Sequence, residues 1–449
     1  MTAHQTSASV DRRTFLRAGV LGLGGLGLSD LLRSRASASE STPDTSCILV
    51  WLNGGPSHID TYDLKPDAPD EYRGPFTPVP TNVVGMKVCE LLPRHARVAD
   101  KFSLIRSVTH NFSAHAGGVQ QVLTGRRPLA VEKEEPDYPD VGSIVKRVRS
   151  ERKPVLPPYV TMPFRFESGG PAYLGKQYEP FVVPVSPNAA RFEVPNLSLN
   201  GAGAARLGER LELLNGFDDV KRARDRAGVM DAMDYHQREA VGLLTGDAAR
   251  RAFDIGCEDP RLRDRYGRTR VGQSLLLARR LAEAGVGLVT VMAGSFDTPN
   301  GNGNWDDHAV SWNIFDQMKL RLPVYDQALT ALIEDIYDHG LDRRVLVVAL
   351  GEFGRTPKVS QGPGGRPGRE HYPAAMSVLV SGGGLKMGQV IGSTDARAER
   401  PRERPLRPTD FLATVYAHLG IDPAQEFREF SGRPLPILPD GEPIPELDG

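Results

Sequence analysis

One apolar stretch limits the folds open to this chain: the unbroken run Val345–Leu350, which ends at Gly351 and Glu352. Half-exposed strands alternate apolar and polar residues, so a continuous β-branched run predicts a strand buried on both faces, as in a parallel sheet. In open α/β sheets, ligands bind beyond the carboxyl ends of the strands. Glu352 and Arg355 follow this strand directly and are therefore the first candidates for a functional site.

The composition is that of a globular protein. A chain of 449 residues with 40% hydrophobic and 25% charged residues can form one large α/β domain with insertions, or two domains. A net charge of −1 gives no reason to expect nucleic acid or an anionic membrane as a partner. The cysteines Cys47, Cys89 and Cys257 show no paired spacing, so neither a disulfide framework nor a thiolate zinc site is predicted.

The first forty residues are typical of an export signal. Residues 11–17 contain a twin-arginine pattern, 18–32 are weakly apolar and glycine-rich, and 36–38 form a small-residue cleavage pattern. The apolar run is shorter than the roughly 20 residues of a membrane span. We therefore predict that residues 1–38 are a twin-arginine signal peptide. The mature protein, residues 39–449, would be exported folded to the periplasm or the exterior, without a stable membrane span. The alternative is a chance pair of arginines before an apolar helix.

Strands and helices alternate along the rest of the sequence. A helix is predicted at 271–284. The strand at 286–292, the long helix ending near His339 and the run Val345–Leu350 then form a β-α-β unit, which predicts parallel strands with a right-handed crossover. Further strands are predicted at 47–52, 102–108, 159–162 and 375–380, further helices at 117–123, 141–148 and 409–419, and a hairpin at 388–392. Residues from about 163 to 265 are irregular and then helical and charged, which indicates an insertion beside the sheet.

Histidines and acids collect in the loops just outside the predicted strands. They are His58, Asp60, Asp306, His308, Glu352 and His371. If the sheet is parallel, these loops share one edge. Imidazoles combined with carboxylates form a mixed nitrogen and oxygen shell, which suits zinc, manganese, iron or calcium depending on geometry. The sequence therefore predicts a divalent metal site at this edge.

Several of these segments also have a purely structural explanation. The alternatives are capping of a helix near Ala309 by Asp306 and Asp307, helix capping by Ser57 or Asp60, loop packing of His371, and a surface ion pair between Glu352 and Arg355. Their coincidence at one edge of the sheet favours the metal site.

Four motifs resemble those of a known family. They are NGGPSHIDTYD at 53–63, Trp-Asp-x-His at 305–308, GEFGRTP at 351–357 and GREHYP at 368–373. Over about residues 47–435 the chain is identified as a member of domain-of-unknown-function family 1501, exported bacterial proteins grouped with the alkaline phosphatase and sulfatase superfamily. The resemblance implies a three-layer α/β/α sandwich with a mostly parallel central sheet and a metal site at its carboxyl edge. It also implies hydrolysis of phosphate or sulfate esters.

The resemblance assigns roles to single positions. The segment from His115 to Arg126 is similar to the sulfatase run that begins with a modified cysteine, so His115 stands at the nucleophile position. Asp306 and His308 resemble paired metal ligands that precede a long helix and a later aspartate, here Asp326. His371 resembles a late histidine ligand.

Two positions depart from the superfamily pattern. Asn53 stands where the superfamily has an aspartate, and Phe353 replaces the histidine of an Asp-His-Gly element whose acid is here Glu352. These exchanges oppose a two-metal phosphatase site, and His115 opposes a sulfatase that uses formylglycine.

The resulting prediction is an exported, metal-dependent hydrolase of sulfate or phosphate esters, with polysaccharides among the substrates considered. Asp306, His308, Glu352 and His371 would hold zinc, calcium or manganese, and His58 and Asp60 would complete the shell. Ser57 or His115 would act in the chemistry, while Arg126 or Arg355 would neutralise the ester oxyanion. The alternative is a catalytically degenerate hydrolase fold that serves as an extracytoplasmic binding or assembly protein.

Overall fold

The computed structural model describes residues 45–130, 133–152, 154–194, 247–294 and 303–449. The predicted signal peptide lies outside the described residues, and so does the stretch 195–246 of the predicted insertion. The domain boundaries derived from the sequence therefore stay predictions. Among the helices that are described, none is both long enough and apolar enough to cross a membrane.

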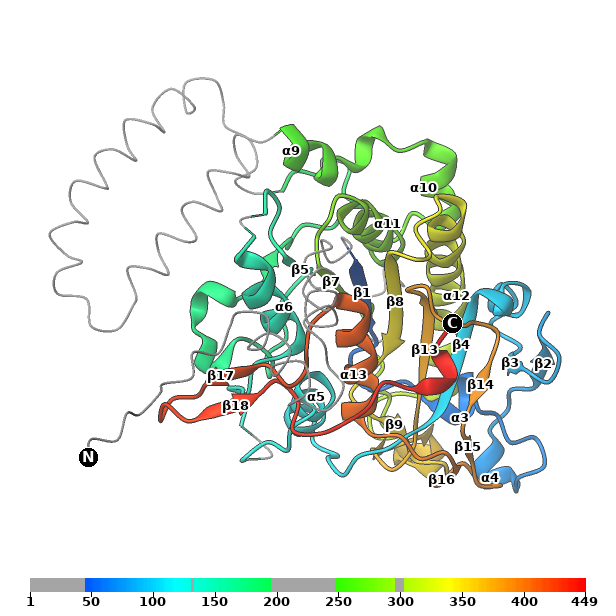
Figure 1. Ribbon diagram of the computed structural model, residues 1–449. Coiled ribbons are helices and arrows are strands. Elements are labelled where there is room, and N and C mark those ends of the chain that lie inside the picture. The colour runs from blue at the N-terminus through cyan, green and yellow to red at the C-terminus, as the bar shows by residue number, and fades with distance from the viewer. Residues whose placement is uncertain (1–44, 131–132, 153, 195–246, 295–302) are drawn as a thin grey trace, which may run out of the picture. The chain divides into compact units, whose positions relative to one another are not determined.

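An eight-stranded sheet has the order β14-β4-β13-β8-β1-β7-β5-β6 (Figure 1). Its strands are β1 (Ser46–Trp51), β4 (Phe102–Val108), β5 (Tyr159–Met162), β6 (Phe181–Val182), β7 (Leu288–Met292), β8 (Val345–Leu350), β13 (Met376–Gly382) and β14 (Val390–Ile391). β1 lies between β7 and β8 and runs parallel to both, whereas β13 runs antiparallel to its neighbours β8 and β4. The predicted mostly parallel sheet, with β8 near its centre, is confirmed.

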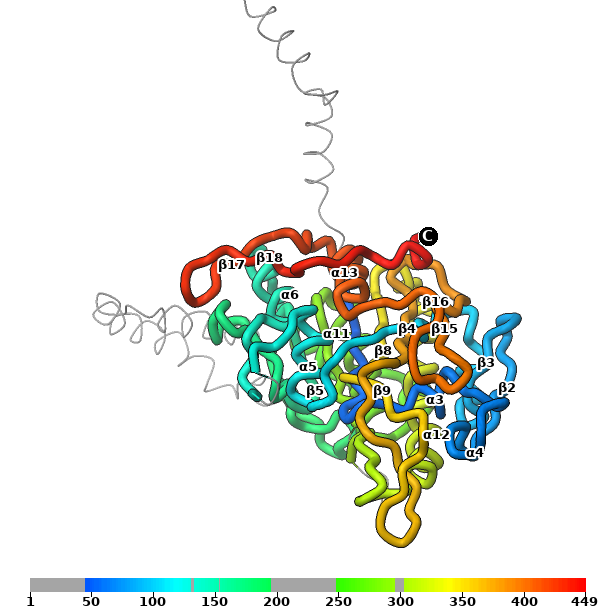
Figure 2. The backbone as a smooth tube through the Cα atoms, turned by 90° about the horizontal axis from the view of Figure 1, so that it is seen from below, coloured from blue at the N-terminus to red at the C-terminus, as the bar shows by residue number. Residues whose placement is uncertain are grey.

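The central strands β1, β7 and β8 are buried along their whole length, which explains why nearly all of their residues are apolar. Alternate residues of β1 enter two different cores: Ile48 and Val50 face one, Leu49 and Trp51 the other. Helices α11 (Arg270–Glu283) and α12 (Ile314–Asp338) pack in the first core. Helices α5 (His115–Thr124), α6 (Val141–Ser150) and α13 (Pro408–Leu419) contribute to the second. This is the predicted three-layer α/β/α sandwich, and Figure 2 shows α12 and α13 on opposite sides of β8.

Shorter elements decorate the edges of the sandwich. The helices are α3 (His58–Thr61), α4 (Asp70–Arg73), α9 (Asp247–Phe253) and α10 (Pro260–Tyr266). The strands are β2 (Pro78–Pro80), β3 (Lys87–Cys89), β9 (Gly354–Arg355), β10 (Ser360–Gln361), β11 (Pro367–Gly368), β12 (His371–Tyr372), β15 (Ser393–Thr394), β16 (Pro401–Glu403), β17 (Glu426–Arg428) and β18 (Pro434–Pro436).

Two details at the β4 side of the sheet differ from the prediction. The hairpin predicted at 388–392 is wrong, because β14 joins the large sheet and pairs with β4 in parallel. The reversed direction of β13 places its amino-terminal end at the carboxyl edge of β8. The segment before β13, which contains His371, therefore lies at the predicted functional edge because β13 is antiparallel.

Candidate metal centre

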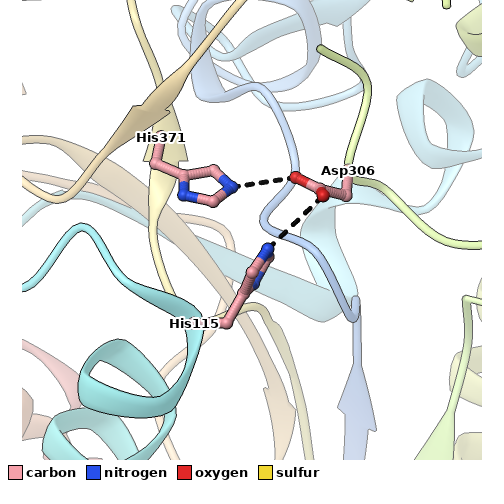
Figure 3. A group of neighbouring side chains, drawn as sticks. All are labelled: His115, Asp306 and His371. Carbon is pink, nitrogen blue, oxygen red and sulfur yellow. Dashed lines mark hydrogen bonds and ion pairs between the residues drawn. The ribbon is translucent and has the colours of Figure 1, made fainter. Parts of the chain in front are cut away.

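Three segments that are far apart in sequence meet at the carboxyl edge of the sheet. They are the first turn of α5, the loop after β7, and β12, which pairs with β9 just beyond β8. Figure 3 shows the imidazoles of His115 and His371 directed at the carboxylate of Asp306. One ligand atom from each of these side chains lies within 4.8 Å of the other two.

The imidazole of His308 also contacts the Asp306 carboxylate. The Nε2 atoms of His371 and His308 both lie 2.9 Å from Oδ1 of Asp306 and 3.0 Å from each other. The Nε2 atom of His115 lies 3.4 Å from Oδ2 of the same carboxylate. Three imidazole nitrogens thus surround one carboxylate, and we call these four side chains the metal-centre residues.

Each of the three imidazoles is held at its other nitrogen by an oxygen acceptor. The pairs are His115 with the Glu352 carboxylate, His308 with the Glu370 carboxylate and His371 with the Ser113 carbonyl. The nitrogen–oxygen distance is 2.7 Å in the first and third pairs. Because these oxygens can only accept, Nδ1 is the donor in each ring, and Nε2 of the neutral ring carries a lone pair.

This donor set fits a divalent cation. Three lone pairs and a carboxylate directed at one point repel one another unless a cation or a proton lies between them. Metal-binding histidines characteristically donate their second N–H to a carboxylate or carbonyl, as all three do in this structure. Three nitrogens and a carboxylate suit zinc, and then iron or manganese. Calcium prefers six to eight oxygen ligands and fits this set less well.

The opposite charges of Asp306 and His115 each stabilise the charged form of the other residue. Burial alone would raise the pKa of Asp306, but hydrogen bonds from His115 and His371 and the Arg355 guanidinium hold it far below its usual value. Burial alone would lower the pKa of His115, but the carboxylates of Asp306 and Glu352 outweigh it and raise the pKa to about 9. In the metal-free site His115 is therefore doubly protonated and positively charged at neutral pH. A bound cation would displace the proton on Nε2.

Arg355 is completely buried and fixes the position of Asp306. Its guanidinium donates to Oδ1 of Asp306 at 2.6 Å, to the carbonyls of Gly55 at 2.9 Å and Arg369 at 3.1 Å, and to the Gly54 carbonyl. These contacts tie the glycine turn after β1 to β9 and to the loop after β7. The structure thus places Arg355 as a positioning residue rather than at an exposed contact with an ester oxyanion.

Phe353 forms the floor beneath two of the imidazoles. The ring is completely buried, and its centroid lies 4.3 Å from that of His371 and 5.3 Å from that of His115. The backbone of Gly55 has a φ of +81°, and a Cβ there would meet the Phe353 ring at 2.5 Å. Phe353 therefore packs against the His115 and His371 rings and limits how they can be oriented.

Glu352 supports His115 from behind. It is completely buried, and Oε1 accepts hydrogen bonds from Nδ1 of His115 at 2.7 Å and from the Gly54 amide at 2.9 Å. The Oε2 atom is buried and has no hydrogen-bond partner among the residues that the structure describes. The ion pair with Arg355, considered as an alternative from the sequence, is replaced by the pair of Arg355 with Asp306.

The helix-capping alternative for Asp306 and Asp307 is wrong. The helix α12 starts at Ile314, and its N-cap is Asn313, whose side chain accepts from the backbone. Asp307 is buried and forms an ion pair with Arg321.

Ser57, His58 and Asp60 lie in a different, completely internal cluster at α3. Asp60 pairs with the buried Arg369 at 2.7 and 3.1 Å and also accepts from Ser57. His58 donates through Nε2 to the Ala398 carbonyl at 2.9 Å, and burial lowers its pKa. Within the part of the chain that is described, none of the three hydrogen-bonds to a metal-centre residue. Their contacts are those of a structural cluster.

Two further residues named from the sequence also lie apart. Arg126 donates to the Pro436 carbonyl, and its guanidinium lies 5.2 Å above the ring of Tyr138. Asp326 accepts hydrogen bonds from the backbone amides of Arg94 and His95 and pairs with the His95 imidazole.

A cavity of about 390 Å³ opens beside the metal centre. His115, Asp306 and Glu352 line it together with residues 164–168, which directly follow β5. Arg165 is the only arginine or lysine among the described residues that line this cavity. The sequence reasoning missed it, although it follows a strand whose carboxyl end lies at the same edge of the sheet.

Comparisons with known proteins identify a family and several loosely similar structures. The model of the family described as "Protein of unknown function (DUF1501)" matches residues 44–447. No curated protein matches the sequence. The solved structures include PsFucS1 sulfatase from Pseudoalteromonas sp., with 11% identity and a TM-score of 0.36, covering 87% of this chain and 70% of that chain.

Two further structures are similar at the same level. The phosphonate monoester hydrolase of Agrobacterium radiobacter has 11% identity and a TM-score of 0.39, covering 90% of this chain and 77% of that chain. The lipoteichoic acid synthase LtaP from Listeria monocytogenes has 10% identity and a TM-score of 0.35, covering 85% and 73%. The likeness is loose at these TM-scores, so the chemistry of the site has to come from its own geometry.

Proposed function

Because this chain belongs to the DUF1501 family of proteins of unknown function, we propose its activity from its site: a metal-dependent hydrolase of sulfate or phosphate esters. One observation carries the proposal. Three imidazole Nε2 atoms and the Asp306 carboxylate converge beside an open cavity, and each imidazole is anchored at Nδ1 by an acceptor. A site that only stabilises the fold has no need of such convergent lone pairs next to solvent.

The metal-centre residues His115, Asp306, His308 and His371 would hold the ion. A bound divalent ion supplies Lewis-acid polarisation of an ester oxygen. The chain's other residues act by positioning: Glu352, Glu370 and the Ser113 carbonyl fix the rings, and Arg355 fixes the carboxylate. This revises the ligand shell proposed from the sequence, since His115 enters it, Glu352 moves behind it, and His58 and Asp60 leave it.

We further propose that the reaction takes place outside the cytoplasm. The support is the twin-arginine pattern at 11–17 and the small-residue pattern at 36–38. Amino-terminal sequencing of the mature protein should find cleavage near Ser39, and replacement of Arg12 and Arg13 by lysine should retain the protein in the cytoplasm.

The test of the activity starts from the purified mature protein. Bound metal is measured by mass spectrometry, and aryl sulfate and aryl phosphate esters are assayed. We expect about one ion per chain, with both metal and hydrolysis lost in Asp306→Ala and His371→Ala. Asp316→Ala, an exposed change in the first turn of α12, is the matched control. Retention of metal and activity in both site variants would refute the proposal.

A second function is favoured by one specific observation. Phe353 fills a position where the superfamily pattern has a metal ligand. A site with fewer ligands would be consistent with a protein that binds an ion or an anion without catalysing hydrolysis. A metal-loaded protein that binds aryl sulfonates but hydrolyses none of the esters would support this extracytoplasmic binding protein over the enzyme.

A further inference from the structure

We infer that the cavity selects esters that carry one negative charge, such as sulfate monoesters or phosphate diesters, over doubly charged phosphate monoesters. The inference rests on the proposed function, because it concerns the charge of the ester group that the metal centre would receive. It comes from the charged side chains that line the cavity and from those directly behind them.

The described lining of the cavity is rich in carboxylates. Asp306, Glu352 and Glu167 line it, and Arg165 is the one fixed cation among the lining residues that the structure describes. His115 also lines the cavity and is neutral when it binds an ion through Nε2. The two charges of a divalent ion and the charge of Arg165 therefore just balance the three carboxylates.

Behind the lining, one cation and one anion lie beside the metal centre, and Glu179, 3.8 Å from Arg165, adds a further negative charge. Arg355 pairs with Asp306, and Glu370 pairs with His308. One is a cation and the other an anion, so together they add no net charge. Counted over the described lining residues and the ion, an ester with one charge leaves one negative charge in excess and an ester with two charges leaves two. Glu179 makes both values more negative. Since charges repel more strongly in a partly desolvated cavity than in water, the second charge is selected against.

Arg165 is free to bind the incoming anion. Its side chain is 54% exposed, and its partner Glu179 is 3.8 Å away and itself 35% exposed. Such a loose, solvated pair is weak, so Arg165 can exchange it for two oxygens of a sulfate or phosphate group. Arg355, in contrast, is buried and already donates to three backbone carbonyls and Asp306.

The cavity wall keeps Glu167 close to this arginine. Phe166 lies between Arg165 and Glu167 in the chain and is anchored by an edge-to-face contact with Trp51 at 5.0 Å. Glu167 is exposed, lines the cavity, and forms no ion pair with any residue that the structure describes. Its negative charge therefore faces the same volume as Arg165 and opposes a second negative charge on the ligand.

A pair of probes with the same shape and different charge tests the selection without turnover. Benzylsulfonate carries one charge, and benzylphosphonate carries two at a pH where it is fully ionised. Titration calorimetry of the metal-loaded protein should show the sulfonate binding about tenfold more tightly, a modest electrostatic difference for one charge. Glu167→Gln should narrow this ratio several-fold, Arg165→Ala should weaken both probes, and Glu193→Gln, an exposed change away from the cavity lining, should leave the ratio unchanged.

Hydrolysis of three 4-nitrophenyl esters completes the test. The sulfate ester and the bis(4-nitrophenyl) phosphate diester, each with one charge, should have the higher kcat/KM values. The phosphate monoester, doubly charged above its second pKa of about 6, should have the lowest. A preference for the doubly charged ester or for the phosphonate overturns the inference but leaves the hydrolase proposal intact. Absence of any hydrolysis overturns the hydrolase, and the calorimetric ratio then decides the charge selection by itself.

Discussion

Oε1 of Glu352 accepts the Nδ1–H of His115 at 2.7 Å, so this acid orients the imidazole that faces Asp306. A carboxylate behind a metal-binding histidine fixes the ring and raises its basicity, and its loss typically lowers metal affinity without abolishing it. Glu352 would thus support the proposed metal centre by orienting His115 and would not bind the ion itself.

The variant Glu352→Gln tests this relationship. Glutamine keeps an oxygen acceptor but removes the charge, so we expect metal affinity to fall by about 10- to 100-fold while the ligands stay in place. Competition with a fluorescent chelator measures the change, with Glu193→Gln as the control. Complete loss of metal, equal to that in Asp306→Ala, would instead make Glu352 a direct ligand.

Asp60→Asn should affect stability and not metal. Asp60 and Arg369 are both completely buried and joined by two hydrogen bonds, so removing the acid leaves an uncompensated cation. The expected loss is about 3–5 kcal/mol of unfolding free energy, measured by urea denaturation of the metal-free protein. Metal stoichiometry of the folded variant should equal that of the parent. A folded variant without metal would return Asp60 to the ligand shell.

The pH dependence follows from His115. Its pKa in the folded metal-free protein is about 9, above its ordinary value of 6.5. The stability that this residue contributes is therefore fully present below about pH 6.5 and is lost as the pH rises through about 9. Urea midpoints of metal-free protein should fall across this window, and His115→Gln should lack that component. A parent and variant with parallel pH profiles would contradict the raised pKa.

Metal affinity should change in the opposite direction over the same window. Because a bound ion displaces the proton of His115, affinity should increase as the pH rises towards about 9. Chelator competition at several pH values measures it. An affinity that is constant over this range would exclude His115 from the shell.

Gly55→Ala should disturb both fold and site. Gly55 has a φ of +81°, and the new methyl group would meet the Phe353 ring at 2.5 Å. Left-handed strain alone costs about 1–2 kcal/mol, and overpacking adds about 1–3 kcal/mol. Gly340→Ala is a matched control, since its φ is +62° and no atom lies within 4 Å of the added Cβ. The two variants should differ in unfolding free energy and in metal affinity. Equal losses would mean that Phe353 gives way without moving the imidazoles.

Much of the fold could be predicted because its signals are local. The run Val345–Leu350 became β8 with the same bounds, and the helix ending at Gly125 became α5, whose C-cap Gly125 has a left-handed backbone. The direction of β13 could not be predicted from periodicity, since a buried strand reads the same in either orientation. It depends on the sheet that the strand joins.

The site could be predicted only in part. Asp306, His308 and His371 were selected as loop residues at strand ends, and the fold brings them together. His58 and Asp60 also follow a predicted strand, but the turn at Gly54 and Gly55 directs them into the protein. There His58 hydrogen-bonds to the Ala398 carbonyl and Asp60 pairs with Arg369. No sequence motif predicts the course of that turn or the anchoring of each Nδ1. The anchoring depends on contacts with residues 62 to 258 positions away.

The anchoring of the imidazoles also has a kinetic meaning. With each Nδ1 bonded to the protein, the rings are already oriented before an ion arrives. An ion could then leave and re-enter without any search through rotamers, and reloading would require only that the ion sheds its water and that His115 loses its second proton. The protein should therefore exchange its metal while the α/β/α sandwich around the site stays folded.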